Sequence, residues 1–225
     1  MGHTSNILII ENELLIIDSF KSALNEISYS NNHLNIRIKT SENYEEALPI
    51  IKNSISTNPI DIVILNIDMP HVDYQKPMFV EDFGNNLRSL LPNIKILAFA
   101  TYCDNYRINN IIDAFDPEVF IIKKDIDYKS LVTSLNSAFE ESSYYSKTVT
   151  SSLRRRAIHK IILDKIDRTL LFHLSKGIRT KDLTKYVFLS EGGIQKRKRR
   201  LKQIFEVEGR GDMLLLESAR EKGFI

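Results

Sequence analysis

The first 140 residues alternate between two kinds of segment, and this alternation constrains the fold more than any other feature. Short apolar, β-branched runs recur along this stretch, namely Ile7–Ile10, Leu34–Lys39, Ile60–Ile67, Ile94–Phe99 and Val119–Ile122. Each run has the length of a strand that is buried on both faces of a sheet. Helical segments separate these runs, namely Glu13–Ile27, Asn43–Ile55, Phe83–Leu91, Asn105–Phe115 and Tyr128–Phe139. The alternation predicts right-handed crossovers and a doubly wound, five-stranded parallel sheet in an α/β domain.

The first helical segment shows which of its faces is buried. Its apolar residues repeat at spacings of three and four, namely Leu14, Ile17, Phe20, Leu24 and Ile27. This spacing predicts one helical face that packs on the sheet.

The strand pattern ends near residue 141, and the remainder of the chain reads as helical. Residues 142–152 are polar and rich in Ser and Thr, which is typical of a linker. Helical segments follow, namely Ser152–His159, Asp164–Ser175, Thr180–Val187, Glu191–Phe205 and Arg210–Lys222. Gly177 and Gly223 follow two of them, where a left-handed C-cap favours glycine. We therefore predict a sheet domain at 1–141, a linker and connecting helix at 142–160 and a small all-α domain at 161–225.

The charge is divided unevenly between these parts. Residues 1–152 hold 12 Lys and Arg against 20 Asp and Glu, whereas residues 153–225 hold 19 against 9. The first part is therefore acidic and the second strongly basic, although the whole chain carries only +2. A basic domain joined to an acidic one indicates that only the second part meets a polyanion.

Polar side chains follow alternate strands of the predicted sheet. Glu11 and Asn12 follow the first strand, Asn66 and Asp68 end the third, and Lys123 follows the fifth. The carboxyl ends of parallel strands meet at one edge of such a sheet, and ligands bind there. We therefore expect these side chains to lie close together.

These residues, in this order, resemble the receiver domain of two-component response regulators over residues 6–140. The family has an acidic pair after the first strand, "D-x-x-M-P" after the third and a lysine after the fifth. The resemblance implies transfer of a phosphoryl group to the aspartate, with Mg²⁺ on the acidic pair.

The chain departs from that pattern at most of the reacting positions. Asn66 stands in the place of the aspartate, and a carboxamide has no anionic oxygen to attack phosphorus. Glu11 and Asn12 stand in the place of the acidic pair. The family also has a switch Thr or Ser after the fourth strand, and Ala100 stands in its place, with Thr101 one step away. We therefore predict a phosphorylation-independent pseudo-receiver with no catalytic activity, bound metal or cofactor.

Two points about this pocket stay open at the level of sequence. Asp68 could accept phosphate in place of Asn66, and a small ligand or a protein partner could bind the receiver-like domain instead. Thirteen residues separate Pro70 from Gly84, where the family has three. This longer loop contains Tyr74, Met78 and Phe79, which either cover the pocket or meet a partner, unless the loop is a tolerated surface insertion.

The basic part contains the pattern of a helix-turn-helix unit. In the first helix Leu183 and Val187 face inward, and Phe188 and Leu189 form an apolar turn before Ser190, a favourable N-cap. The second helix has apolar residues at helical spacing, namely Ile194, Leu201, Ile204 and Phe205. Two helices joined by a tight turn, the second rich in Lys and Arg, are typical of a helix-turn-helix.

Over about 60 residues this part resembles the LuxR/NarL-type DNA-binding domain. The family's motif positions are matched by Leu174, Gly177, Lys181-Asp182-Leu183, Val187, Leu189-Ser190 and Ile194, and its ending by Ala219 and Gly223-Phe224-Ile225. The chain departs from the motif at Gly193, Gln195 and Arg197, so we expect a sequence preference of its own. The resemblance implies binding to double-stranded DNA as a homodimer.

The side chains predicted to contact DNA fall into two groups, those for base edges and those for phosphate. Gln195, Lys196 and Arg199 are the candidates for base edges, because Gln pairs with adenine and Arg with guanine. The candidates for phosphate are Thr180, Lys181, Lys198, Arg200 and Lys202.

We therefore expect a cytoplasmic DNA-binding transcription regulator. The chain has a single cysteine, Cys103, and no apolar run that approaches a membrane span. The alternatives are a conventional regulator phosphorylated at Asp68 and a module that binds a protein partner.

Overall fold

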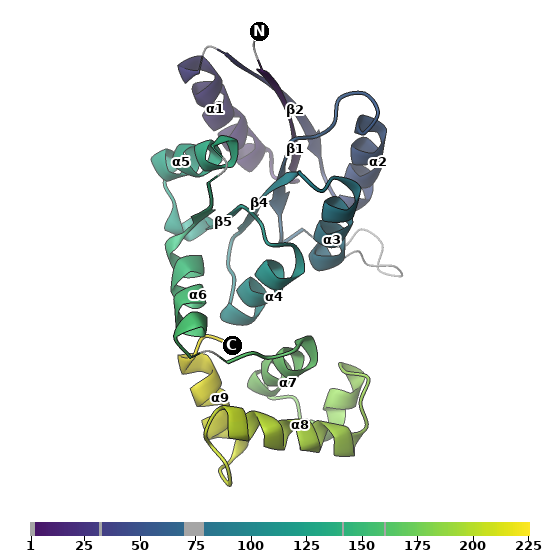
Figure 1. Cartoon of the computed structure of the whole chain (residues 1–225), viewed down its shortest axis with the longest axis vertical. Coiled ribbons are helices and arrows are strands. Elements are labelled where there is room, and N and C mark those ends of the chain that lie inside the picture. Colours follow the sequence, from purple (N-terminus) through teal and green to yellow (C-terminus); the bar gives the residue numbers. More distant parts are fainter. Residues whose placement is uncertain (1–2, 32, 70–78, 141, 160) are drawn as a thin grey trace. The chain divides into compact units, whose positions relative to one another are not determined.

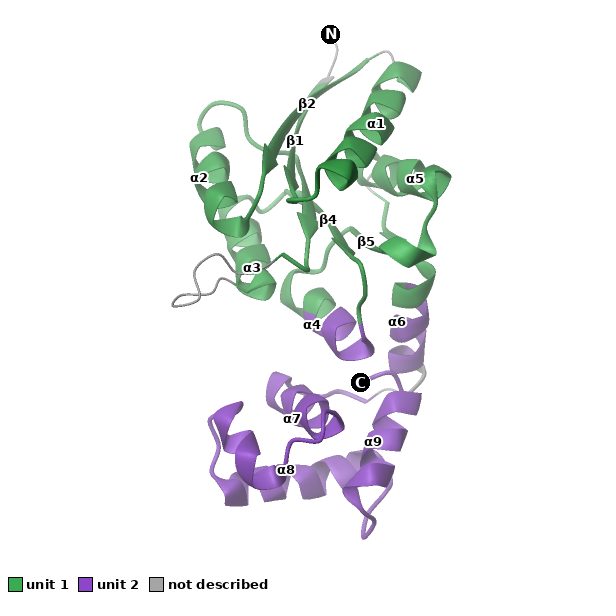
Figure 2. Cartoon of the chain, turned by 180° about the vertical axis from the view of Figure 1, so that it is seen from behind, with its two compact units in different colours: residues 1–103, 111–149 green, residues 104–110, 150–225 purple. Residues whose placement is uncertain are grey.

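The computed structural model describes residues 3–31, 33–69, 79–140, 142–159 and 161–225. The chain divides into two compact units (Figure 2). The first unit comprises residues 1–103 and 111–149, and the second comprises residues 104–110 and 150–225. The domain boundaries predicted from the sequence, at 1–141, 142–160 and 161–225, remain predictions.

The first unit is built on a parallel sheet. Its strands are β1 (His3–Ile10), β2 (Leu34–Ser41), β3 (Ile62–Asn66), β4 (Lys95–Ala100), β5 (Val119–Ile122) and β6 (Tyr144–Tyr145). Within the described residues they lie in the order β2-β1-β3-β4-β5-β6, and every pair is parallel. The predicted doubly wound sheet is confirmed, with β6 as an additional edge strand. The sequence did not reveal β6 because it is two residues long and lies in the Ser-rich segment.

Helices cover both faces of this sheet (Figure 1). They are α1 (Leu14–Ser30), α2 (Tyr44–Ser54), α3 (Val80–Leu90), α4 (Asn105–Phe115) and α5 (Tyr128–Phe139), with the short 3₁₀ helix η1 (Lys123–Asp125) after β5. α1 and α5 lie on one face, and α2 and α3 on the other (Figure 1). Ile7 and Ile9 face α1 and α5, which follows from the two-residue repeat of a strand.

Two predictions about these helices are corrected by the structure. Leu14 is 75% exposed, because it is the first residue of α1 and the buried face begins at Ile17. α3 begins at Val80, three residues before the predicted start at Phe83, so Gly84 lies inside the helix. A Cβ at Gly84 would overlap the ring of Phe115, so glycine lets α3 approach that ring closely.

The segment that reads as a linker is structured in its second half. α6 (Lys147–His159) begins five residues before the predicted start, directly after β6. Asp125 anchors this start, because it accepts hydrogen bonds from the Thr148 N–H at 2.7 Å and the Ser146 hydroxyl at 2.8 Å. Burial would raise the pKa of Asp125, but these hydrogen bonds outweigh it and hold the pKa below its ordinary value. The carboxylate therefore stays charged at neutral pH.

The second unit is helical and has its own core. It contains α7 (Lys165–Ser175), the 3₁₀ helix η2 (Thr180–Lys185), α8 (Glu191–Ile204) and α9 (Asp212–Glu221). Leu170, Leu183, Ile194 and Leu215 are buried together at its centre. Gly177 and Gly223 have φ angles of 82° and 81°, so the predicted left-handed positions after α7 and α9 are confirmed.

No helix in the described ranges combines the length and the apolar character needed to cross a membrane.

Candidate functional site

The carboxyl ends of β1, β3 and β5 bring Glu11, Asn66 and Lys123 together in the first unit. Glu11 is fully buried, and its Oε2 accepts a hydrogen bond from Asn66 Nδ2 at 3.1 Å. The same oxygen lies 3.8 Å from Lys123 Nζ, so the structure has Lys123 paired with Glu11. Its Oε1 accepts from the backbone N–H groups of Asn12 and Glu13 at 2.7 and 3.0 Å. The buried carboxylate is therefore neutralised and hydrogen-bonded on both oxygens.

Asn66 fits this network because a carboxamide has a donor end and an acceptor end. Asn66 is only 4% exposed. Its Oδ1 accepts the backbone N–H of Asp68 at 2.8 Å, which leaves its NH₂ group to face Glu11. A carboxylate at position 66 would instead place a second negative charge about 3 Å from Glu11, a repulsive arrangement in a buried site.

The remaining predicted residues of this pocket surround the network. Asn12 and Asp68 are exposed, and Asp68 Oδ2 accepts the backbone N–H of Thr101 at 2.7 Å. Ala100 is fully buried, whereas Thr101 is exposed. The Asp68 carboxylate therefore holds the chain that leaves β4.

Two aromatic residues complete the pocket, and sequence reasoning missed both. The Tyr44 hydroxyl donates a hydrogen bond to the backbone oxygen of Asn66 at 2.7 Å, and its ring stacks on Phe83. Lys123 Nζ lies 5.3 Å from the centroid of the Phe99 ring, within the range of a cation–π contact. Only the aromatic side chain at the start of a predicted helix could have pointed to Tyr44, and that signal is not specific.

The Mg²⁺ that a receiver would hold does not fit these residues. Glu11 already accepts hydrogen bonds from two backbone N–H groups and one amide and forms an ion pair with Lys123, and Asn12 and Asn66 carry no charge. Within the described part of the chain, no group of three His, Cys, Asp or Glu residues is placed to hold a metal ion.

Most of the inserted loop, which was predicted to cover this pocket, to meet a partner or to be a surface insertion, lies outside the described residues. Tyr74 and Met78 lie outside the described residues. Phe79 is described, and it lies half-exposed directly before α3.

In the second unit, α8 presents two different faces. Ser190 caps the helix, with its Oγ accepting the N–H of Gly193 at 3.2 Å, so the predicted N-cap is confirmed. Ile194, Leu201 and Phe205 are buried as predicted. The predicted short helix at Thr180–Val187 is the 3₁₀ helix η2, which ends at Lys185 and places Leu183 in the core.

Lys198, which was predicted to contact phosphate, lies on the buried face of α8. It is only 6% exposed, and its Nζ donates to Thr180 Oγ1 at 2.8 Å and to Asp212 Oδ2 at 2.6 Å. Lys198 lies four residues after Ile194 and three before Leu201, so it belongs to the buried face. The Lys198 ammonium group is therefore not presented to a phosphate group, whereas the half-buried Thr180 hydroxyl accepts from Lys198 and keeps its own O–H donor.

The other basic residues of α8 differ in how far they are already paired. Lys202 lies 3.0 Å from Asp212 and donates to the Arg210 carbonyl at 2.7 Å. Arg200 lies 3.7 Å from Asp167 but is more than half exposed. Lys196 and Arg199 are exposed and form no ion pair within the described residues. Together with Gln195, which is also exposed, they form the free face of α8.

Sequence reasoning missed exposed polar residues near this free face. Gln203 extends the face by one helical turn, because it lies four residues after Arg199. Arg179 and Lys185 line a shallow hollow of about 420 Å³ with Lys181, which was predicted and is exposed. Lys185 pairs with Asp182 at 3.3 Å.

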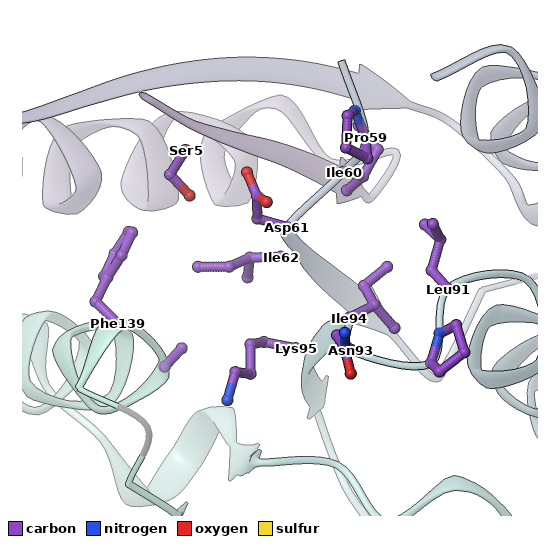
Figure 3. Close-up of a pocket in the computed structure, with 12 residues that line it drawn as sticks. Ser5, Pro59, Ile60, Asp61, Ile62, Leu91, Asn93, Ile94, Lys95 and Phe139 are labelled. Carbon is purple, nitrogen blue, oxygen red and sulfur yellow. The ribbon is translucent and has the colours of Figure 1, made fainter. Parts of the chain in front are cut away.

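A second hollow of about 420 Å³ lies at the amino ends of β3 and β4, whereas the Glu11 pocket lies at the carboxyl ends of the strands. It is lined by the residues that lead into β3 and β4 and by Phe139 (Figure 3). Its carboxylate, Asp61, already accepts the N–H of Asn6 at 2.7 Å. Ligands of such sheets bind at the carboxyl ends of the strands, so this amino-end hollow is the weaker candidate site.

No protein-family model matches the sequence, and no curated protein matches it either. Solved structures nevertheless resemble the chain over almost its whole length. In the structure of two RcsB dimers bound to two parallel DNAs, RcsB is 14% identical with a TM-score of 0.60, and the match covers 97% of this chain and 99% of that one. RcsB from Salmonella enterica serovar Typhimurium, bound to a promoter in the presence of the phosphomimetic BeF₃⁻, is 14% identical with a TM-score of 0.61 and the same coverage.

The first unit also has a match of its own. The isolated receiver domain of the Salmonella protein is 13% identical with a TM-score of 0.53, and the match covers 66% of this chain and 98% of that one. Identities this low show the fold alone. The chain has the fold of a two-domain response regulator, a receiver-like unit followed by a helix-turn-helix unit, as the sequence predicted.

Proposed function

We propose that the chain is a sequence-specific DNA-binding transcription regulator whose receiver-like unit works without phosphorylation. The free face of α8 is the observation that carries this proposal. Gln195, Lys196 and Arg199 project from the helix that follows the tight turn, where a helix-turn-helix protein reads the major groove. Gln and Arg side chains can each make two hydrogen bonds to one base, so this face can read sequence.

Around this face, exposed cations supply contacts to the DNA backbone. Lys181 and Arg200 keep the phosphate role expected from the sequence, and Arg179 joins them. The excess of ten positive charges in residues 153–225 gives the long-range attraction that phosphate binding needs.

The proposal that phosphate is not the signal rests on Asn66. The amide is tied to Glu11 and to the Asp68 backbone, and it has no nucleophilic oxygen. Asp68, the other candidate acceptor, already holds the Thr101 N–H. In this proposal a protein partner, a small ligand or the amount of protein controls activity.

We further propose that the chain acts as a homodimer in the cytoplasm. RcsB is bound to DNA as dimers in one of the similar structures. A dimer would place two copies of α8 on two half-sites about one helical turn of DNA apart.

Selection from a random pool of DNA duplexes tests the DNA-binding part. The full-length chain should enrich one motif, and a Lys196→Ala/Arg199→Ala double variant should lose that motif while it keeps its fold. If the wild-type chain binds no duplex even at low ionic strength, the proposal is wrong.

Intact-mass measurement tests the phosphate-independent part. The chain is incubated with acetyl phosphate and Mg²⁺, and its mass should stay unchanged. One added phosphate that disappears in Asp68→Ala would instead identify Asp68 as the acceptor.

A further inference from the structure

We propose that Arg197 and Lys198 are positioning residues, which fix the direction of α8 through Asp164, Asp167 and Asp212 and so decide which bases the free face meets. This inference rests on the proposed DNA-binding function. It assigns a role in DNA recognition to three acidic residues, although acidic residues ordinarily oppose binding to a polyanion.

Lys198 ties α8 to η2 and α9. Its ammonium group is buried within hydrogen-bond distance of the Thr180 hydroxyl and the Asp212 carboxylate, at 2.8 and 2.6 Å. Taking an ammonium group out of water is costly, and an apolar residue of similar volume often stabilises a core as well or better. The ion pair instead fixes the orientation of α8, because its hydrogen bonds form only at one rotational position of the helix about its axis.

Arg197 ties the same part of α8 to the start of α7. Its Nη1 lies 2.6 Å from Asp164 Oδ2 and 2.8 Å from Asp167 Oδ1. Asp164 is also the N-cap of α7, and it accepts the N–H of Asp167 at 2.8 Å. Asp167 is fully buried, so this contact is held in a fixed place.

The two ties act in different directions. Consecutive residues of an α-helix point about 100° apart, so Arg197 and Lys198 contact different neighbours. Two such restraints fix the rotation of α8 about its axis. Lys196 and Arg199 directly flank these residues, so a small rotation of α8 would move both away from their base edges.

The protonation of these groups agrees with charged pairs at neutral pH. Burial would raise the pKa of Asp212, but hydrogen bonds from Lys198 and Lys202 outweigh it and hold the pKa below its ordinary value. The hydrogen bond to Asp164, followed by that to Asp167, raises the pKa of Arg197 further.

The decisive test is Asp212→Asn, with Glu217→Gln as the matched control. Both changes remove one negative charge from α9, and Glu217 is exposed with no ion pair in the described part of the chain. The probes are a duplex that the wild-type chain selects from a random pool and a duplex of shuffled sequence. Asp212→Asn should bind the selected duplex about tenfold more weakly, the loss of one base contact, and should bind the shuffled duplex no more weakly than wild type. Glu217→Gln should bind both at least as tightly as wild type.

A second variant distinguishes a positioning role of Lys198 from a contact with phosphate. Lys198→Gln should weaken binding to the selected duplex but leave the slope of log affinity against log salt unchanged, because Lys198 contacts no phosphate. Loss of a phosphate contact would lower that slope by about one unit. Combining Lys198→Gln with Asp212→Asn should lose less affinity than the two separate losses together, since both changes remove one tie. Thermal unfolding of each variant identifies the temperature at which all are folded.

The outcomes separate the two levels of the proposal. If Asp212→Asn behaves as Glu217→Gln does on both duplexes, or if Lys198→Gln lowers the salt slope by one unit, the positioning role is wrong while the regulator assignment stands. If the wild-type chain binds neither duplex, both are wrong.

Discussion

The Glu11 pocket and α8 both contain charged and amide side chains, but these are paired and mostly buried in the pocket and partly exposed on α8. In the pocket, Glu11, Asn66 and Lys123 satisfy one another and are mostly buried. On α8 the ion pairs occupy one side only, and Lys196 and Arg199 stay exposed without an ion pair in the described residues. Polar groups that are paired inside the protein hold structure, whereas exposed cations grouped on one face are available to a partner. This difference supports the proposal that the first unit works without phosphorylation while α8 offers the surface that recognises DNA.

The largest expected effect concerns the pocket. Glu11→Ala removes the buried acceptor of one amide and two backbone N–H groups and the ion-pair partner of Lys123, so the free energy of unfolding of the first unit should fall by about 3 kcal/mol. Urea unfolding measures this loss. Glu13→Ala, an exposed change two residues away, is the control and should have little effect. A loss below about 0.5 kcal/mol for Glu11→Ala would show that the network does not hold the unit together.

The next effect concerns the free face of α8. Arg199→Ala should weaken binding to the selected duplex by about 2 kcal/mol and bind the shuffled duplex almost as wild type does, because a base contact is lost. Arg200→Ala, the neighbouring arginine, should weaken both duplexes alike and lower the salt slope by about one unit. Affinity titrations at several salt concentrations distinguish the two. Equal behaviour of the two variants would contradict the division of α8 into faces.

A smaller effect of opposite sign is expected at the start of α8. A Cβ at Gly192 would meet no atom within 4 Å, and its φ angle is not left-handed. Gly192→Ala should therefore stabilise the second unit by about 1 kcal/mol, because alanine favours the helix. Thermal unfolding measures this gain, with Gly177→Ala as the contrast. That change should destabilise, because Gly177 has a φ angle of 82°. A destabilising Gly192→Ala would show that the first turn of α8 is held differently.

The smallest effect is the pH dependence of the second unit. The pKa values of Asp164 and Asp212 are held below their ordinary values, so their stabilising contribution is complete above the unfolded-state pKa of about 4. It is lost as the pH falls through their lower folded-state pKa values, because the unfolded chain then binds more protons. The protection factors of the α8 amides, which compare each exchange rate with that of an unfolded chain at the same pH, should therefore fall below about pH 4, and less so in Asp212→Asn. Exchange protection that stays constant to lower pH in the wild type would contradict these ion pairs.

Much of the fold could be predicted because its signals are local. Runs of β-branched residues and the three-to-four spacing in helices lie within one element, and the bounds predicted for α4, α5 and β5 agree with the structure. β6 could not be predicted because two residues are too few to show an alternating pattern. The start of α6 could not be predicted because Asp125, which anchors it, lies outside residues 142–152.

The candidate sites could be predicted only in part, because side-chain pairing depends on distant segments. The meeting of Glu11, Asn66 and Lys123 followed from the order of strands, and the structure places them together. The amide orientation of Asn66 and the Tyr44 hydrogen bond depend on packing that no spacing reveals. The prediction for Lys198 was wrong because a charged residue is usually exposed, whereas its position between Ile194 and Leu201 lies on the buried face of α8. Its acidic partner, Asp212, lies fourteen residues away on another helix.

The affinity of the full-length chain for its selected duplex, measured with and without acetyl phosphate and Mg²⁺, distinguishes phosphate-independent from phosphate-dependent DNA binding. We predict tight, salt-dependent binding with the same dissociation constant under both conditions. A dissociation constant that changes about tenfold on addition of the phosphodonor would contradict it.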